Sequence, residues 1–118
     1  MKIAVAGIGY VGLSVAVLLA QRHDVVLIDI EPGKVQHIIS RTPPFDDPEI
    51  ARYLREVPLR LHATLNPKQA YEGADYVVVA TSTDFDPVTG AFDTASVEAV
   101  IQSVVAINPQ AVIVIRST

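Results

Sequence analysis

Residues 3–14 read IAVAGIGYVGLS, an apolar run that ends in three glycines and leads into a second apolar run. The glycines are Gly7, Gly9 and Gly12, in the spacing G-x-G-x-x-G. In this pattern the first glycine permits a tight turn, the second lets a pyrophosphate approach the backbone, and the third lets a helix pack closely on the sheet. Because glycines also mark ordinary turns, the context decides whether the loop holds a dinucleotide.

Apolar segments that favour strands alternate with helical patterns along the whole chain. The expected strands are residues 2–7, 25–30, 60–64, 75–81 and 111–117, and the expected helices are residues 11–21, 32–40, 48–57, 66–73 and a segment capped by Asp93. Asp47 is expected to cap the third helix, with Pro48 in its first position. Short links between strands and helices indicate a parallel sheet with right-handed crossovers. We therefore expect residues 1–118 to form one α/β domain, a doubly wound three-layer Rossmann sheet with strand order 3-2-1-4-5.

The composition excludes several classes of protein. Half of the 118 residues are hydrophobic, and the net charge is −4. With no local cluster of Lys and Arg, this argues against binding to nucleic acid or to an anionic membrane. The absence of cysteine excludes disulfides, thiolate metal sites and a cysteine nucleophile within these residues. Since no segment is typical of a signal peptide or a membrane span, we expect a soluble cytoplasmic protein.

An acidic residue follows the second expected strand, VVLIDI. Asp29 comes after Gly12 at a spacing close to the roughly 20 residues expected for the acid that binds the adenosine ribose. Its charge would repel a 2′-phosphate, and Ile30 and Glu31 supply no compensating cation, which favours NAD over NADP. Alternatively, Asp29 caps the next helix, or does both. Lys34 lies within reach of the ribose hydroxyls, or is a solvated charge on the helix.

Hydroxyl side chains follow the fourth and fifth expected strands. Thr81, Ser82 and Thr83 come after one strand, and Ser117 and Thr118 after the other. Each could serve only as a turn or cap residue. Because ligands of open α/β sheets bind outside the carboxyl ends of the strands, we expect these residues to form a polar rim around one site.

We expect no metal site. Asp84, Asp86 and Asp93 lie in the segment 82–93, but their spacing is not that of a calcium loop, and turn and cap chemistry explains them better. The three histidines, His23, His37 and His62, are scattered over different elements, and nothing marks any of them as a ligand or a base.

Several segments together resemble the nucleotide-sugar 6-dehydrogenases. They are MKIAVAGIGYVGLS at 1–14, VLLAQ at 17–21, DI at 29–30 with Lys34 following, GADYVVVATST at 73–83, FDTASVEAVI at 92–101 and VIRST at 114–118. The likeness covers the whole chain and is closest to the amino-terminal NAD-binding domain of bacterial UDP-glucose 6-dehydrogenases. It implies an enzyme that oxidises the C6 alcohol of UDP-glucose twice, with two NAD, to give UDP-glucuronate.

The resemblance also implies roles for individual residues. The glycine loop with Tyr10 and Val11 is expected to bind NAD, and Asp29 and Lys34 to hold the adenosine ribose. Thr118 is expected to lie near the cofactor and to have an auxiliary catalytic role in positioning a water molecule. The expected cofactor-binding residues are Gly7, Gly9, Tyr10, Val11, Gly12, Asp29, Lys34, Thr81, Thr83 and Thr118.

This chain departs from the family pattern in two ways. Ser82 stands where the family usually has Pro, and Asp84 where it commonly has Asn, so the loop that carries Thr83 is expected to differ. The catalytic Cys, Lys and Asn and most UDP-sugar contacts of the family come later in the chain. We therefore expect a cofactor domain that is inactive alone, with the UDP-sugar a partner only of the full-length enzyme, which could be an oligomer.

Two alternatives remain open at this point. One is a stand-alone nucleotide-sensing module, like the Rossmann-type regulatory domains of ion-transport systems, which the length and the glycine loop suit equally well. The ATST segment, the FDTASVE helix start and the terminal RST weigh against it. The other is a domain engineered for its fold alone.

Overall fold

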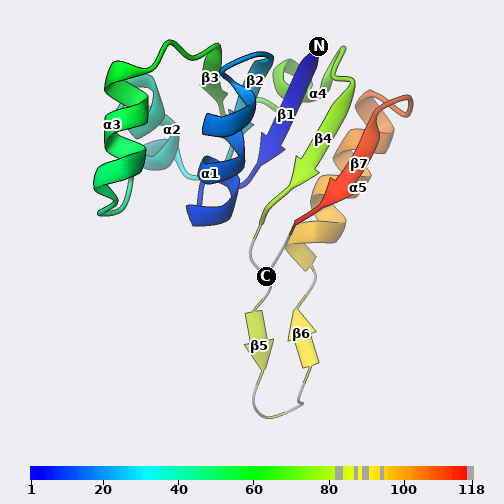
Figure 1. Cartoon of the computed structure of the whole chain (residues 1–118). Helices are drawn as coiled ribbons and strands as arrows, with labels where there is room; N and C mark the ends of the chain where they lie inside the picture. The colour runs from blue at the N-terminus through cyan, green and yellow to red at the C-terminus, as the bar shows by residue number, and fades with distance from the viewer. Residues whose placement is uncertain (82–83, 87, 89–90, 94, 117–118) are drawn as a thin grey trace.

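The computed structural model describes residues 1–81, 84–86, 88, 91–93 and 95–116 (Figure 1). Its main sheet has five parallel strands in the order β3-β2-β1-β4-β7, which confirms the predicted topology. The strands are β1 Lys2–Ala6, β2 Asp24–Ile28, β3 Leu61–Thr64, β4 Tyr76–Val79 and β7 Val112–Ile115. The helices are α1 Tyr10–Leu19, α2 Pro32–Ile39, α3 Pro48–Glu56, α4 Pro67–Tyr71 and α5 Ala95–Ile107.

The helices lie on both faces of the sheet, with α1, α2 and α3 on one face and α4 and α5 on the other (Figure 1). Strands β1, β2 and β4 are therefore covered twice, which is why they are continuous apolar runs without alternation. Val5 and Leu27 are fully buried in the layer under α1. Ala4 and Val77 are fully buried in the layer under α4 and α5, where Val104 packs.

The cap predicted for α3 is confirmed. Asp47 is the N-cap, and its carboxylate accepts hydrogen bonds from the backbone N–H groups of Glu49 (3.1 Å) and Ile50 (3.0 Å), with Pro48 in the first position. The cap predicted at Asp93 concerns a side chain outside the described part of the structure.

The segment 82–93, whose aspartates were explained by turn and cap chemistry, holds a short hairpin that the sequence analysis did not predict. Strands β5 Asp84–Asp86 and β6 Ala91–Asp93 pair antiparallel, with Phe85 opposite Phe92. Aromatic residues favour strands, and this cross-strand pair suits a ladder in spite of the flanking aspartates. The hairpin projects beyond the carboxyl end of the main sheet (Figure 1).

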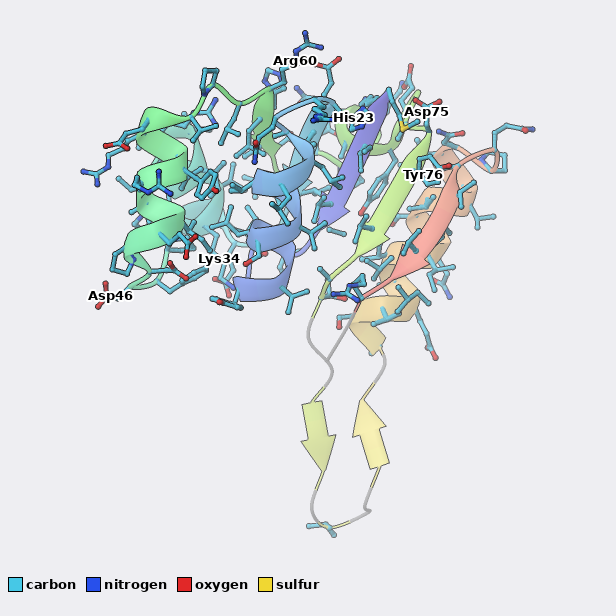
Figure 2. All side chains as sticks on the ribbon, viewed as in Figure 1. His23, Lys34, Asp46, Arg60, Asp75 and Tyr76 are labelled. Atoms are coloured by element: carbon cyan, nitrogen blue, oxygen red, sulfur yellow. The ribbon has the colours of Figure 1, made fainter. Side chains whose placement is uncertain are left out.

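Strands β1, β2, β4 and β7 end one to two residues earlier than the sequence pattern predicted, and β3 ends at Thr64 as predicted. β2 ends at Ile28, so Asp29 lies outside the ladder and is available for other bonds. His23, Arg60 and Asp75 lie at the amino end of the sheet, and Lys34 lies at the carboxyl end (Figure 2). No helix in the described ranges is long and apolar enough to cross a membrane.

Candidate functional site

A cavity of about 330 Å³ lies at the carboxyl end of the sheet. It is enclosed by the loop after β1, the residues after β2, the end of β4 and the start of α5. Its lining residues are Gly7, Ile8, Gly9, Tyr10, Val11, Asp29, Ile30, Glu31, Lys34, Ala80, Thr81 and Ser96. The structure thus brings together seven of the ten residues that the sequence analysis singled out.

Two of the three glycines are required by the packing of the loop itself. Gly7 has a φ of +108°, and a Cβ there would lie 2.9 Å from the backbone of Ala80 and Thr81. A Cβ at Gly12 would overlap the carbonyl oxygen of Gly7 and lie 3.2 Å from the Ala80 Cβ. Gly7 and Gly12 therefore allow the loop, the first turn of α1 and the end of β4 to approach closely.

Gly9 is different, because a Cβ there would meet no atom within 4 Å. The open side of this residue faces the cavity, of which it is a lining residue. Nothing in the packing of the described residues requires a glycine at this position. The free space fits a group that must approach the backbone closely, as a pyrophosphate does at the second glycine of this motif.

The amino end of α1 has the electrostatics of an anion site. Gly9 is its N-cap and provides no side-chain hydrogen bond, and the first turn contains no acidic residue. The backbone N–H groups of this turn have no partner within the helix, and they carry the positive end of the helix dipole. Such a terminus suits a phosphate group.

Asp29 connects the two walls of the cavity. One carboxylate oxygen accepts a hydrogen bond from the backbone N–H of Ile8 at 2.8 Å, and the other accepts one from Glu31 at 3.0 Å. The N-cap of α2 is Glu31, so the alternative that Asp29 is the cap of this helix was wrong. Because an ionised carboxylate has about four acceptor positions, Asp29 can still accept hydrogen bonds from ribose hydroxyls.

Lys34 lies beside Asp29 on the first turn of α2 and forms an ion pair. Its Nζ is 3.8 Å from Oε2 of Glu31, and the side chains of Lys34 and Glu31 are 38% and 61% exposed. Lys34 is the one cation among the described residues that line the cavity. A basic side chain is thus held at the position where the ribose of a dinucleotide is expected.

Tyr10 and Thr81 complete the described rim. The Tyr10 side chain is 64% exposed, and its ring centroid lies 5.9 Å from that of Phe45. The Oγ1 atom of Thr81 is buried without a hydrogen-bond partner in the described structure. Since buried hydroxyls are generally paired, Thr81 is suited to a hydrogen bond with a bound molecule.

A second, more apolar cavity of about 260 Å³ adjoins the first and shares Gly7, Asp29 and Thr81 with it. Leu65, Tyr71 and Val100 are among its other lining residues. Burial raises the pKa of Tyr71 to about 12. The sequence analysis missed these apolar walls, which come from segments far apart in the chain.

The signal that could have indicated this second cavity is Ile30. This residue directly follows Asp29, lines both cavities and is 94% exposed. An isoleucine so exposed beside the ribose-binding acid is suited to contact a flat apolar group of a ligand.

Several predicted site residues lie outside the described residues. Ser82 and Thr83 follow Thr81, and Ser117 and Thr118 follow β7; the structure does not describe these four residues. The described residues include no group of three or more His, Cys, Asp or Glu that could hold a metal ion.

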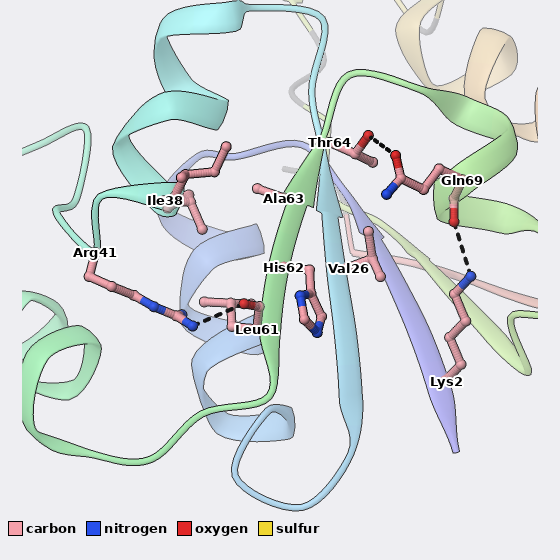
Figure 3. Close-up of a pocket in the computed structure, with 10 residues that line it drawn as sticks. Lys2, Val26, Ile38, Arg41, Leu61, His62, Ala63, Thr64 and Gln69 are labelled. Carbon is pink, nitrogen blue, oxygen red and sulfur yellow. Dashed lines mark hydrogen bonds between the residues drawn. The ribbon is translucent and has the colours of Figure 1, made fainter.

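A larger cavity, about 460 Å³, lies along β3 (Figure 3). Two of its cationic side chains each donate a hydrogen bond to a backbone carbonyl. Arg41 Nη2 donates to the carbonyl oxygen of Leu61 at 3.1 Å, and Lys2 Nζ donates to that of Gln69 at 3.0 Å. We place the ligand in the smaller cavity, because the glycine loop, the start of α1 and Asp29 meet there.

Comparisons with known proteins show the family of the chain. The model of the UDP-glucose/GDP-mannose dehydrogenase family, NAD binding domain, matches residues 1–118. A UDP-glucose 6-dehydrogenase of Streptococcus pneumoniae is 48% identical over 118 residues, and one of Campylobacter jejuni is 42% identical over 120 residues. Each match covers the whole chain and 30% of the relative, so the chain spans less than a third of these proteins.

A solved structure leads to the same family. The ternary complex of GDP-mannose dehydrogenase from Pseudomonas aeruginosa superposes with a TM-score of 0.88 at 27% identity, covering 100% of this chain and 28% of that one. The predicted resemblance is thereby confirmed. The chain belongs to the UDP-glucose/GDP-mannose dehydrogenase family, of which it forms the NAD binding domain.

Proposed function

We propose that this chain is the cofactor domain of a UDP-glucose 6-dehydrogenase, which converts UDP-glucose and two NAD to UDP-glucuronate and two NADH. The observation that carries the proposal is the open space at Gly9, at the uncapped amino end of α1 and in the same cavity as Asp29. The two relatives named above carry this activity in their names, which supports UDP-glucose as the substrate.

In this proposal each wall of the site holds one part of NAD. The N–H groups at the start of α1 bind the pyrophosphate next to Gly9, with Tyr10 and Val11 beside it. Asp29 and Lys34 hold the hydroxyls of the adenosine ribose. The adjoining apolar cavity would receive the adenine, with Ile30 as an apolar contact for its ring.

The carboxyl ends of β4 and β7 are proposed to face the nicotinamide. In this proposal Thr81, Thr83 and Thr118 supply hydroxyls there, and Thr118 has an auxiliary role in positioning a water molecule. The bound cofactor supplies the hydride acceptor. The chain's own contribution is to orient it, since hydride transfer depends on the positions of the reacting atoms.

The proposal includes a preference for NAD. The carboxylates of Asp29 and Glu31 both line the ribose end of the cavity. A 2′-phosphate placed there would meet two negative charges and one cation, which is unfavourable. NADP should therefore bind more weakly than NAD.

The proposal also concerns the wider setting. Residues 1–118 act as one domain, and the UDP-sugar binds in the longer protein, which could be an oligomer. We place this protein in the cytoplasm. The family match favours this enzyme over a nucleotide-sensing regulatory module.

Calorimetric titration of the chain with NAD and with NADP tests the proposal. We expect saturable binding of one NAD per chain and a weaker affinity for NADP. A folded chain, checked by circular dichroism, that releases no heat with millimolar NAD would contradict the proposed function. Equal affinities for the two cofactors would contradict only the role given to the carboxylates.

A further inference from the structure

We propose that Glu31 is a positioning residue for cofactor selectivity: it holds the Lys34 ammonium so that this cation cannot serve as a partner for a 2′-phosphate. The inference rests on the proposed function, because it concerns the ribose end of the same site. It adds an action through Lys34 to the direct repulsion of a 2′-phosphate that the proposed function gives to Glu31.

The geometry around Glu31 is fixed from both sides. Its backbone N–H donates to Asp29 Oδ1 at 3.0 Å, which holds Glu31 at the N-cap of α2. Its carboxylate Oε2 lies 3.8 Å from Lys34 Nζ, one turn along the helix. Glu31, Lys34 and Asp29 all line the cavity at the glycine loop. Asp29 therefore helps to position Glu31, which in turn pairs with Lys34.

This pair has little to do with the stability of the fold. An exposed ion pair contributes on the order of 0–1 kcal/mol, and both side chains are well exposed. Glu31 also makes no side-chain cap of α2. We therefore expect the ion pair to affect ligand binding more than the stability of the fold.

A free cation next to the ribose is what a 2′-phosphate requires, as a nearby Arg provides in NADP-binding sites. Lys34 is the one described lining residue that could supply it. While the Lys34 ammonium is paired with Glu31, it can still contact a ribose hydroxyl. Its positive charge is then balanced by Glu31 and attracts a 2′-phosphate less strongly. Without Glu31 the flexible lysine can turn to the 2′-phosphate, which carries close to two negative charges at neutral pH.

The test is a double-mutant cycle read as the ratio of dissociation constants for NADP and NAD. We expect Glu31→Gln to tighten NADP about tenfold, the worth of one hydrogen bond to a charged group. NAD, which has no 2′-phosphate, should change by less than about twofold. In a Lys34→Met background, Glu31→Gln should change the ratio by a clearly smaller factor, because only the direct repulsion between Glu31 and the 2′-phosphate is relieved and no cation is released.

Glu56→Gln is the matched control. It makes the same change of charge at the last residue of α3, an exposed position that does not line the cavity. We expect it to leave the ratio and the thermal midpoint unchanged. Glu31→Gln and Lys34→Met should also keep the thermal midpoint, measured by circular dichroism, since the pair is exposed.

Each outcome decides between the claims. If Glu31→Gln leaves the ratio unchanged while NAD still binds, the inference is wrong and the proposed function stands. If the variant tightens NADP equally with and without Lys34, Glu31 acts as a simple negative charge, and its role as a positioning residue is wrong. If the unchanged chain binds no NAD, the proposed function fails, and this inference fails with it.

Discussion

Asp29 accepts a hydrogen bond from the backbone N–H of Ile8 at 2.8 Å, which ties the residue after β2 to the glycine loop after β1. The acid expected to bind the ribose therefore also shapes the loop expected to bind the pyrophosphate. Ile8 is 1% exposed, so its N–H has little access to water if the carboxylate is removed. Substitution of Asp29 should affect the fold as well as the ligand.

For Asp29→Ala we expect two separate losses. The free energy of unfolding should fall by about 1–3 kcal/mol without cofactor, because a part-buried N–H loses a charged acceptor. NAD should bind more weakly by a further 1.5–3 kcal/mol, about the worth of hydrogen bonds from the ribose to a charged group. Urea unfolding measures the first quantity and calorimetry the second.

Asp47→Ala is the control for this experiment. Asp47 also accepts two backbone hydrogen bonds, but it does not line the cavity at the glycine loop. We expect a loss of about 1 kcal/mol in the free energy of unfolding, as for other N-caps, and an unchanged dissociation constant for NAD. An equal loss of affinity in both variants would show that Asp29 acts only through stability.

Gly9→Ala should separate binding from stability. Gly9 has a φ of −117°, which other residues adopt readily, and a Cβ there meets nothing within 4 Å. The thermal midpoint should therefore stay within a few degrees of the original. NAD binding should weaken by at least about tenfold, because the methyl group occupies the space proposed for the pyrophosphate. An early-melting variant with normal NAD affinity would make this glycine a structural one.

Gly12→Ala should have the opposite effect. The added methyl group overlaps the carbonyl oxygen of Gly7, a backbone atom that cannot move without displacing the loop. We expect the free energy of unfolding to fall by about 1–3 kcal/mol, as for other overpacked sites. Unfolding by urea in the absence of NAD measures this loss, and an unchanged midpoint would contradict the close packing of α1 on the loop.

The sequence predicts the sheet because its signals are local. The glycine loop, the apolar strands and the cap at Asp47 each depend on neighbouring residues, and right-handed crossovers then leave few possible orders for the strands. Gly7, Gly9 and Asp29 could be assigned to one site from the sequence, because the glycine motif and the acid that follows it have a characteristic spacing along the chain. Their chemistry is carried by spacing along the chain.

The sequence does not reveal the contacts between segments that lie far apart in the chain. The pairing of Phe85 with Phe92 depends on a register that aspartates and a proline conceal, because these residues are rare in strands. The contribution of Leu65 and Tyr71 to the apolar cavity arises only when α4 packs against the sheet. The bond between Asp29 and Ile8 likewise depends on the distance between two strand ends.

Tyr71 predicts how stability depends on pH. Burial raises its pKa to about 12 in the folded chain, above its ordinary value near 10. Between these values the unfolded chain releases a proton that the folded chain retains. Stability is therefore complete below pH 10 and falls by about 1.4 kcal/mol per pH unit as the pH rises towards 12.

Tyr71→Phe isolates this effect, because phenylalanine has the same ring and no hydroxyl to titrate. Between pH 9 and pH 11, the free energy of unfolding of the original chain should fall by about 1.4 kcal/mol more than that of the variant. Parallel curves for the two proteins over this range would show that the Tyr71 hydroxyl is hydrated in the folded chain.

The last prediction concerns activity. The chain should bind NAD and yet fail to oxidise UDP-glucose, because binding the cofactor is only part of the reaction. The sugar must also be held with its C6 against the nicotinamide, and such positioning accounts for about 7–11 kcal/mol of a barrier. The chain contains no cysteine, so it cannot form a covalent thiol intermediate with an aldehyde.

The absorbance of NADH at saturating NAD and UDP-glucose measures this directly. We expect no turnover by the 118-residue chain in a preparation whose NAD binding has been confirmed by calorimetry. A matched preparation of Gly9→Ala serves as the blank for contaminating dehydrogenase, since any trace of host enzyme would be equally active in both. Turnover that is present in the original chain and lost in Gly9→Ala would show that the substrate-holding groups lie within these residues, and that the division of labour proposed for this family member is wrong.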